Sequence, residues 1–385
     1  MSELALKPLL ADVAKQAASA DESRSVDASV IQALKSNPIM SFTASENIGG
    51  LNQSIQRCGD ELAVLAAACP STAWVLWNHL CTFHLFAGLL GPDNQSQLQQ
   101  IVEAREWVCF PAGASTGIQG QVVGDEIILN GKAAFGSGAR YAEYAGASFM
   151  IEGHDAPSFS LVDLRQDGVE VDPDWRAMSL RASATDTVYY RDARVTSEHV
   201  VPFLFMYRKA FRQPDFAVVH HRYREDWVAL SDIWLAYMAC GHLQNTLDGV
   251  VEGIRDRIAI VGVKVAERPT VHVNLGHAQA KINAARDTAQ AVAKETDERI
   301  SAEMIPTEAD YLRQTGAAMT ALSLCGEALQ LLQRIMGGNG LREGAIFERQ
   351  VRDFQAMPLH INAHPDRVSE QVGRNLLGLE TENPF

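Results

Sequence analysis

This chain of 385 residues lacks any regular pattern of cysteines. Its six cysteines form no CxxC pair and no regular spacing, and most lie in apolar stretches such as WNHLCTFHLF. Zinc ribbons and disulfide frameworks need cysteines at set spacings, so neither class is expected. We expect free, buried thiols in a reducing cytoplasm, and these are Cys58, Cys69, Cys81, Cys109, Cys240 and Cys325.

Positive charge is also scarce. The chain has 33 Lys and Arg against 47 Asp and Glu, a formal net charge of −14. Phosphate backbones and anionic membrane surfaces would repel such a chain, so nucleic acids and membranes are not expected partners. No apolar run reaches about 18 residues, and no signal peptide is evident. The expected location is the cytoplasm.

The common nucleotide-binding loops are missing. No GxGxxG follows a predicted strand and opens a helix, and no GxxxxGK[ST] occurs. Those glycine-rich loops are what lets a backbone approach a nicotinamide dinucleotide or the phosphates of ATP. We therefore expect no site for either ligand.

The hydrophobic period divides the chain into three zones. Residues 1–108 have helical spacing and include STAWVLWNHLCTFHLFAGLLG, which is apolar all round and predicts a buried core helix. Residues 109–215 are short β-rich runs separated by turn residues, and VVGDEIILNG predicts a hairpin. Residues 216–385 return to long helices typical of an up-down bundle.

This order predicts an α+β fold that is mainly α. We expect an N-terminal helical domain, a central antiparallel β domain and a C-terminal four-helix bundle. The order is not that of a βαβ or Rossmann arrangement.

Five stretches, in order, resemble motifs of the acyl-CoA dehydrogenase family. SENIGG resembles its PExxGG loop, and ILNGKAAFGSGARYAEYAGASFMIEG resembles its LNGxKxWITNGxxAD segment. MSLRASATDTVYYRDARVTSEHVVP resembles GxRxTxTxxVxFxxVxVPxxxxV. QRIMGGNGL resembles QxxGGxGY, and FERQVRDF resembles ERxxRD. The resemblance implies the fold of that family over essentially the whole chain.

The resemblance also implies a flavin site between the β domain and the bundle. Phe135 stands where the family has an aromatic residue that packs on the flavin ring, and Ser137 stands where it has a hydroxyl near flavin N5. Neighbouring subunits of a homotetramer complete the phosphate site in the family. The glycine-rich turn Gly337, Gly338, Asn339 and Gly340 and, more weakly, Arg268 match that part.

The general base of the dehydrogenases is not found in its usual place. In most of the family a glutamate follows ERxxRD by about nine residues, in a YEGT-like sequence, and removes the substrate's α proton. Here Leu359, His360 and Ile361 stand in that neighbourhood. A minority of the family has its base on an earlier bundle helix, where this chain has Trp234 with Asp232 two residues away. An acyl-CoA dehydrogenase with a relocated base therefore stays open.

A histidine in place of that glutamate resembles the flavin-dependent monooxygenases of the same fold. Their examples are the oxygenase component of hydroxyphenylacetate hydroxylase and dibenzothiophene monooxygenase. RDFQAMPLHINAHPDRVSEQVGRNLLG is similar to their RDxxxxxxHxxxxxP…VGRxxLG segment, and FGSGARYAEYA to their FxSGxxxAxW segment. Such enzymes receive reduced FMN or FAD from a separate NAD(P)H:flavin reductase and form a C4a-hydroperoxide with O2, which hydroxylates the substrate.

This resemblance assigns roles to particular residues. Ser137 and His360 are the expected catalytic residues; His360 orients or deprotonates the substrate or bonds the peroxide. His84 and His79 are expected to line the substrate pocket, together with Trp77 and Trp234. The substrate would be a small aromatic or heteroaromatic molecule, although N- or S-oxygenation uses the same chemistry.

The histidine pair at i and i+4 near the C-terminus could also bind a metal. Pro358 and Pro365 bracket His360 and His364, so a helix between them would be barely two turns long. We therefore expect no metal site. His364 is expected to cap the turn or to bond the backbone.

Overall fold

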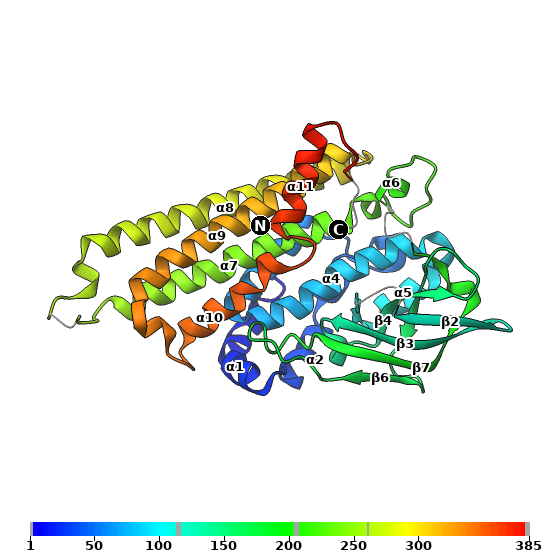
Figure 1. Cartoon of the computed structure of the whole chain (residues 1–385), viewed down its shortest axis with the longest axis horizontal. Coiled ribbons are helices and arrows are strands. Elements are labelled where there is room, and N and C mark those ends of the chain that lie inside the picture. The colour runs from blue at the N-terminus through cyan, green and yellow to red at the C-terminus, as the bar shows by residue number, and fades with distance from the viewer. Residues whose placement is uncertain (1–2, 113–116, 204–207, 260–261, 382–385) are drawn as a thin grey trace.

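A computed structural model describes residues 3–112, 117–203, 208–259 and 262–381. The chain begins with helices that pack beside the C-terminal bundle and the sheet (Figure 1). They are α1 (Leu10–Ser23), α2 (Ala28–Ser36), α3 (Ile55–Ala68), α4 (Pro70–Leu90) and α5 (Gln95–Ala104). A 3-10 turn at Lys7–Leu9, with Pro8 inside it, precedes α1.

Helix α4 is the core helix that the sequence predicted. Pro70 occupies its first turn, where a missing N–H costs nothing, and Gly91 ends it with a positive φ of 63°. Of the helices described, it alone is long and apolar enough to cross a membrane, but 89% of its most apolar window is buried inside the fold. Its composition is therefore explained by its place in the core.

The central zone forms one twisted sheet with strand order β6-β7-β3-β2-β4-β5-β8, and β1 pairs with β4. The strands are β1 (Val108–Cys109), β2 (Ile118–Val123), β3 (Glu126–Gly136), β4 (Tyr144–Ile151), β5 (Ser158–Asp163), β6 (Val169–Asp172), β7 (Asp186–Thr196) and β8 (Val201–Pro202). The predicted hairpin is present, because β2 and β3 pair antiparallel across Gly124 and Asp125.

The sheet is mostly antiparallel, as expected, but two of its strand pairings are parallel. Strand β4 runs parallel to both β1 and β2, while the other pairings are antiparallel. After β3 the chain passes through a 3-10 turn at Ala139–Tyr141 and returns on the far side of β2. That crossover places β4 beside β2, to which it runs parallel, and not beside β3 as in a meander. The alternation of side chains in each strand does not reveal it.

The C-terminal zone is a helical bundle, as expected. Its long helices are α7 (Trp227–Ile254), α8 (Pro269–Ser301) and α9 (Glu308–Met336); α6 (Arg208–Phe211) is short, and α10 (Ile346–Gln355) and α11 (Pro365–Leu376) follow. The fourth helix of the bundle, α10, is much shorter than the other three. Thr307 and Asp310 form a capping box at the start of α9.

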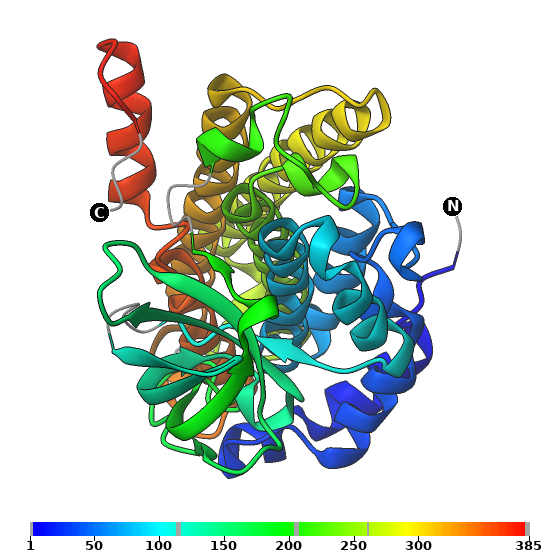
Figure 2. The ribbon, with the colours of Figure 1, turned by 90° about the vertical axis from the view of Figure 1, so that its right-hand side faces the viewer.

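The N-terminal helices and the bundle share one core. Gly241 of α7 lets α3 approach closely, because a Cβ there would lie 2.0 Å from the carbonyl oxygen of Ala63. In the turned view α11 stands away from the rest of the bundle (Figure 2).

Candidate active site

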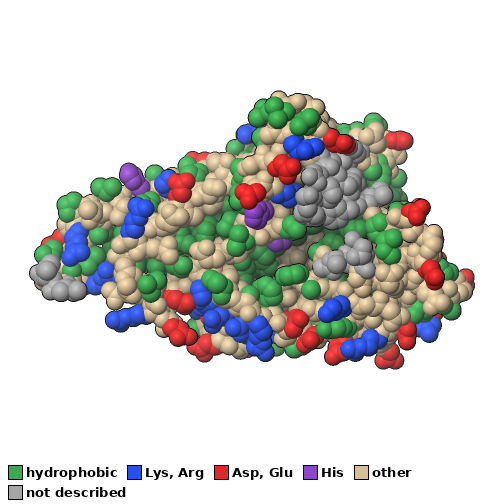
Figure 3. Space-filling view, viewed as in Figure 1, with side chains coloured by type: hydrophobic (Ala, Val, Ile, Leu, Met, Phe, Trp, Pro, Cys, Tyr) green, Lys and Arg blue, Asp and Glu red, His purple; other side chains and the backbone are tan. Residues whose placement is uncertain are grey.

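A cavity of about 530 Å³ lies where α4, the sheet and the segment after α10 meet. Apolar side chains gather around a hollow on this face of the molecule (Figure 3). The described lining residues are Trp74, Trp77, Asn78, Cys81, Thr82, Phe110, Ala112, Phe135, Ser137, Trp175, Ala177, Met178, Ser179, Leu180, Ser183, Thr185, Trp227, Gln355, Ala356, Leu359, His360, Ile361 and Asn362. The volume is in the range of cavities that bind small organic ligands.

One face of α4 forms a wall of this cavity. Trp74, Trp77, Asn78, Cys81 and Thr82 are spaced at i, i+3, i+4, i+7 and i+8, so they form a single stripe along the helix. The indole N–H of Trp77 donates to the carbonyl oxygen of Ser231 on α7 at 3.0 Å, which fixes the ring. The stripe presents two large aromatic rings followed by three smaller side chains.

Ser137 reaches the cavity on a tight turn at the end of β3. Phe135 has a φ of 61°, and the sequence FGSG turns the chain sharply there. Gly138 needs to be glycine, because its φ is 76° and a Cβ would lie 3.0 Å from Val75 Cγ1. The Ser137 hydroxyl accepts a hydrogen bond from Trp74 Nε1 at 3.0 Å and shares another with Thr185 Oγ1 at 3.0 Å. It is therefore held in one orientation.

His360 lies on the cavity wall against the α4 tryptophans. Its ring centroid is 5.0 Å from that of Trp77 and 5.6 Å from that of Trp74, both in edge-on geometry. Its Nδ1 accepts a hydrogen bond from the backbone N–H of Asn362 at 3.3 Å. Burial, and secondarily the positive charge of Arg367, lowers the pKa of His360 from 6.5 to about 4. The neutral ring therefore has its proton on Nε2, which makes Nε2 a donor for a bound molecule.

The turn that holds His360 is tied to the bundle. Asn362 Nδ2 donates to Ser231 Oγ at 3.0 Å, and Arg367 Nε donates to the Ile361 carbonyl oxygen at 2.9 Å. His364 is the N-cap of α11 and accepts a hydrogen bond from the Asp366 backbone N–H at 3.3 Å. This agrees with the supporting role that the sequence predicted for His364.

Three residues expected in the pocket lie in the core instead. His79 accepts from the Val108 backbone N–H at 3.1 Å and bonds the Met40 carbonyl oxygen at 3.1 Å. His84 bonds the Glu225 carbonyl oxygen at 2.9 Å, and Trp234 Nε1 donates to the Ile55 carbonyl oxygen at 3.0 Å.

None of the three lines the cavity, so the prediction that they contact the substrate is not supported. The physical reason is helical rotation. Adjacent residues on α4 point about 100° apart, so His79 faces the core while Asn78 faces the cavity.

The glycine-rich turn and Arg268 are remote from this cavity within one chain. Gly337 to Gly340 follow α9, and Arg268 precedes α8, at the end of the bundle opposite α11 (Figure 1). Arg257 Nη2 links these two regions by donating to the Ile335 carbonyl oxygen at 3.3 Å. Of the predicted cofactor residues, only Phe135 and Ser137 line the cavity.

Sequence reasoning missed several lining residues. Phe110, Trp175 and Trp227 enter the cavity from three different loops or element ends, and Asn78 and Thr82 enter from α4. The signal that could have found the last two is the spacing from Trp74 and Trp77 along one helical face. The three aromatic residues have no local pattern that predicts their position.

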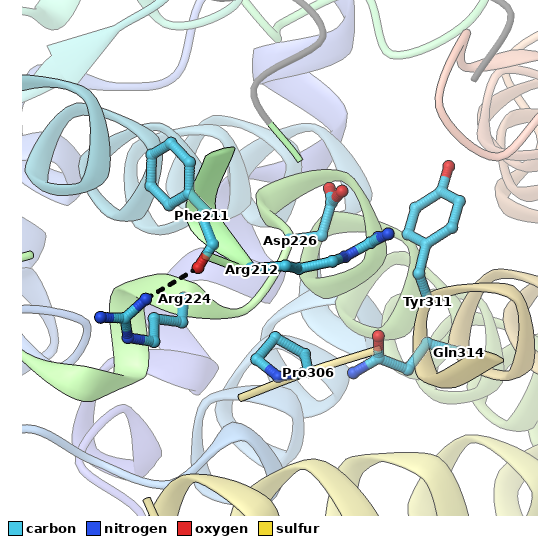
Figure 4. A pocket seen from close by; sticks show the side chains of 7 residues that line it. All are labelled: Phe211, Arg212, Arg224, Asp226, Pro306, Tyr311 and Gln314. Atoms are coloured by element: carbon cyan, nitrogen blue, oxygen red, sulfur yellow. Dashed lines mark hydrogen bonds between the residues drawn. The ribbon is translucent and has the colours of Figure 1, made fainter. Parts of the chain in front are cut away.

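A second pocket is far smaller, at about 10 Å³. Its side chains come from α6, α9 and the chain before α7, and Arg224 donates to the Phe211 carbonyl oxygen at 3.0 Å (Figure 4). That volume holds about one water molecule. No group of three or more His, Cys, Asp or Glu suited to a metal occurs among residues 3–112, 117–203, 208–259 and 262–381.

Comparison with known proteins identifies the architecture. Residues 233–365 match the family described as acyl-CoA dehydrogenase, C-terminal domain. The solved structure of XiaF from a Streptomyces species, in complex with FADH2 and glycerol, superposes with a TM-score of 0.87 at 19% identity over 98% of this chain and 95% of that one. The chain has the acyl-CoA dehydrogenase fold. Dibenzothiophene monooxygenase TdsC from Paenibacillus sp. A11-2 shares that fold, with a TM-score of 0.85 at 18% identity over 98% of this chain and 97% of its own.

Relatives by sequence point to one branch of proteins with this fold. The chain is 25% identical over 97% of its length to the flavin-dependent monooxygenase oxygenase subunit HsaA of Rhodococcus jostii, 97% of which is covered. It is also 25% identical over 95% of its length to the oxygenase component of FADH2-dependent resorcinol hydroxylase of a Rhizobium species, 91% of which is covered. These findings confirm the predicted relationship to oxygenase components of two-component flavin-dependent monooxygenases.

Proposed function

We propose that this protein is the oxygenase component of a two-component flavin-dependent monooxygenase that hydroxylates a small aromatic or heteroaromatic molecule. The observation that carries the proposal is the cavity itself, with His360 and Ser137 on its wall and no carboxylate among its described lining residues. Reduced FMN or FAD supplies the electrons that activate O2. A separate NAD(P)H:flavin reductase is the partner that delivers it, because the sequence has no nicotinamide motif.

The residues present suit a flavin ring. Phe135 is a large apolar side chain that is 63% exposed, and its ring meets Trp175 edge-on at 6.3 Å. A planar aromatic ring placed on Phe135 would cover it. The hydroxyls of Ser137, Ser183 and Thr185 lie on the same wall and could bond the polar edge of such a ring.

The protein's own groups orient the substrate and exclude water. Trp74 and Trp77 give the cavity rigid apolar walls that stack on an aromatic substrate. His360 acts as a hydrogen-bond donor through Nε2, because its Nδ1 is already bonded to the backbone. This geometry favours a role for His360 as a hydrogen-bond donor, to a substrate oxygen or to activated oxygen, over a role as a base that removes a proton.

The acyl-CoA dehydrogenase alternative is weaker. Such an enzyme needs a carboxylate aimed at the substrate. Asp232, the nearest carboxylate to the alternative base position, is fully buried on α7 and does not line the cavity. N- or S-oxygenation remains compatible with the same walls, since these reactions differ in the substrate atom and not in the residues that surround it.

We also propose that the protein is a homotetramer in the cytoplasm. Leu376 and Leu377 at the end of α11 are 80% and 77% exposed, which is unusual for two adjacent leucines. Arg268 and the turn at Gly337 and Gly338 lie far from the cavity of their own chain. A neighbouring subunit could cover the leucines and bring the turn to a flavin phosphate. Light scattering of the purified protein measures the subunit number, and a monomer would contradict this part.

The function is tested with chemically or photochemically reduced flavin and no reductase. The protein, reduced FMN or FAD, and a panel of phenols, indoles and thiophenes are mixed with ¹⁸O-labelled O2. We expect one labelled oxygen atom in the product, formed only with reduced flavin. Absence of labelled product with both flavins and the whole panel, or reduction of bound oxidised flavin by an acyl-CoA, would sink the proposal.

A further inference from the structure

Most polar groups on the cavity wall are already engaged with the protein. Ser137 bonds Trp74 and Thr185. Ser179 Oγ donates to the Asp353 carbonyl oxygen at 3.2 Å. The wall therefore presents mainly apolar surface and satisfied hydroxyls to a ligand.

Asn78 is the exception on α4. Its Oδ1 has a long contact with Thr82 Oγ1 at 3.5 Å. Within the described ranges, no protein group accepts a hydrogen bond from its Nδ2. The residue is partly exposed to the cavity, whereas its neighbours Trp77 and His79 are buried and bonded to carbonyl oxygens. An unpaired amide facing an apolar cavity is satisfied when a ligand brings an acceptor.

No described residue on the cavity wall carries a charge. The lining set contains no Asp, Glu, Lys or Arg, and the stretch 113–116 that follows Ala112 in sequence reads GAST. Burial keeps His360 neutral by lowering its pKa to about 4. A buried anion would have no counter-ion among these groups, which is costly in an apolar cavity.

We propose that Asn78 determines substrate specificity, by donating a hydrogen bond from its side-chain amide to an uncharged polar group of the substrate, and that the cavity selects neutral over anionic aromatic molecules. This proposal rests on the proposed function. Asn78 lies one helical turn, about 6 Å, from Trp74 along the cavity face of α4. It follows Trp77, whose ring contacts His360, so a ring held between these aromatic groups has its substituents within reach of both donors.

The test measures binding without turnover. Three probes of matched shape are 2-naphthol, naphthalene and 2-naphthoate, which are a neutral hydroxy compound, its hydrocarbon and its anionic counterpart. Equilibrium dialysis with and without oxidised FMN gives dissociation constants for the native protein, Asn78→Leu and the matched control Gln99→Leu. Gln99 is an exposed amide on α5, bonded only to Glu103 among its described neighbours.

For the native protein we expect 2-naphthol to bind more tightly than naphthalene and at least tenfold more tightly than 2-naphthoate. Asn78→Leu should weaken 2-naphthol about tenfold, the effect of one net hydrogen bond, and leave naphthalene unchanged. Gln99→Leu should change neither. The proposal is overturned if 2-naphthoate binds as tightly as 2-naphthol, if Asn78→Leu weakens both neutral probes equally, or if no probe binds.

This outcome is separable from the proposed function. The dialysis experiment needs neither O2 nor reduced flavin. If 2-naphthol binds selectively through Asn78 but reduced flavin gives no labelled product, the specificity role of Asn78 is supported and the monooxygenase reaction is not.

Discussion

The two faces of α4 are both buried and largely apolar but have different surroundings. Trp74, Trp77 and Asn78 face the cavity, whereas His79 and Phe83 face the core. On the core face, His79 has both ring nitrogens bonded to backbone groups, and His84 bonds the Glu225 carbonyl oxygen through Nε2. On the cavity face, the Nδ2 of Asn78 has no acceptor among the residues that the structure describes. On this helix, an unused hydrogen-bond donor that faces a cavity therefore marks the candidate site.

The largest expected effect is a loss of stability, and it should differ between substitutions on the core face and on the cavity face of α4. Phe83 is 2% exposed within the apolar cluster between α4 and the sheet. Phe83→Ala should lower the free energy of unfolding by about 3–5 kcal/mol, because it leaves a hole in a packed core. Thr82→Ala, its neighbour on the cavity wall, should cost less than about 1 kcal/mol, since Thr82 already borders open space. Urea denaturation measures both, and equal losses would contradict the assignment of faces.

The second largest effect is expected on the yield of the oxygenation reaction. His360→Ala should reduce oxygenated product per reduced flavin consumed about a hundredfold, or roughly 2.7 kcal/mol, the effect of one positioned donor. Flavin binding should be retained, because the Phe135 and Ser137 wall is unchanged. Product yield and flavin affinity are measured side by side. An unchanged yield would show that the edge-on contact of His360 with Trp77 is only packing.

The apolar pattern of α4 alone does not distinguish its core face from its cavity face. His360 and Ser137 each lie in a stretch that resembles a known motif, and both line the cavity; their catalytic roles stay predictions. No motif supports the prediction that His84 and His79 line the pocket, and α4 has apolar residues on all sides and no amphipathic stripe from which to infer its rotation. The tertiary partners Glu225, for His84, and Val108, for His79, decide their orientation.

The fold was more predictable than the site. Long helical periods and turn residues gave the order of helices, strands and bundle, which local patterns determine. The parallel pairing of β4 with β2 depends on a crossover of the chain and leaves no trace in the alternation of side chains. Trp175 and Trp227 reach the cavity for the same kind of long-range reason.

The buried histidine His84 on the core face of α4 should make the stability of the protein depend on pH. Burial, with a smaller contribution from Arg222, lowers the pKa of His84 from 6.5 to about 3. The unfolded chain therefore binds a proton that the folded chain does not, so stability falls as the pH drops from 6.5 toward 3. The loss is about 1.4 kcal/mol per pH unit for this histidine.

His84→Gln keeps a donor for the Glu225 carbonyl oxygen and removes the titration. Its stability should fall less steeply between pH 6.5 and pH 4 than that of the native protein. His277→Gln, exposed on α8, should keep the native slope. Urea denaturation at several pH values compares the three, and parallel curves for all of them would exclude a buried, neutral His84.

The smallest effect distinguishes the two histidines near the C-terminus. His364 caps α11 by accepting from the Asp366 backbone N–H, and it does not line the cavity. His364→Ala should cost about 1 kcal/mol of stability, as loss of an N-cap does. The product yield per reduced flavin should stay near the native value, because His360 keeps its own bond to Asn362. His364→Asn, a good capping residue, should restore the stability. If the product yield drops in His364→Ala as far as in His360→Ala, the two histidines act as one unit. The distinction between a cavity histidine and a structural histidine would then be wrong for this segment.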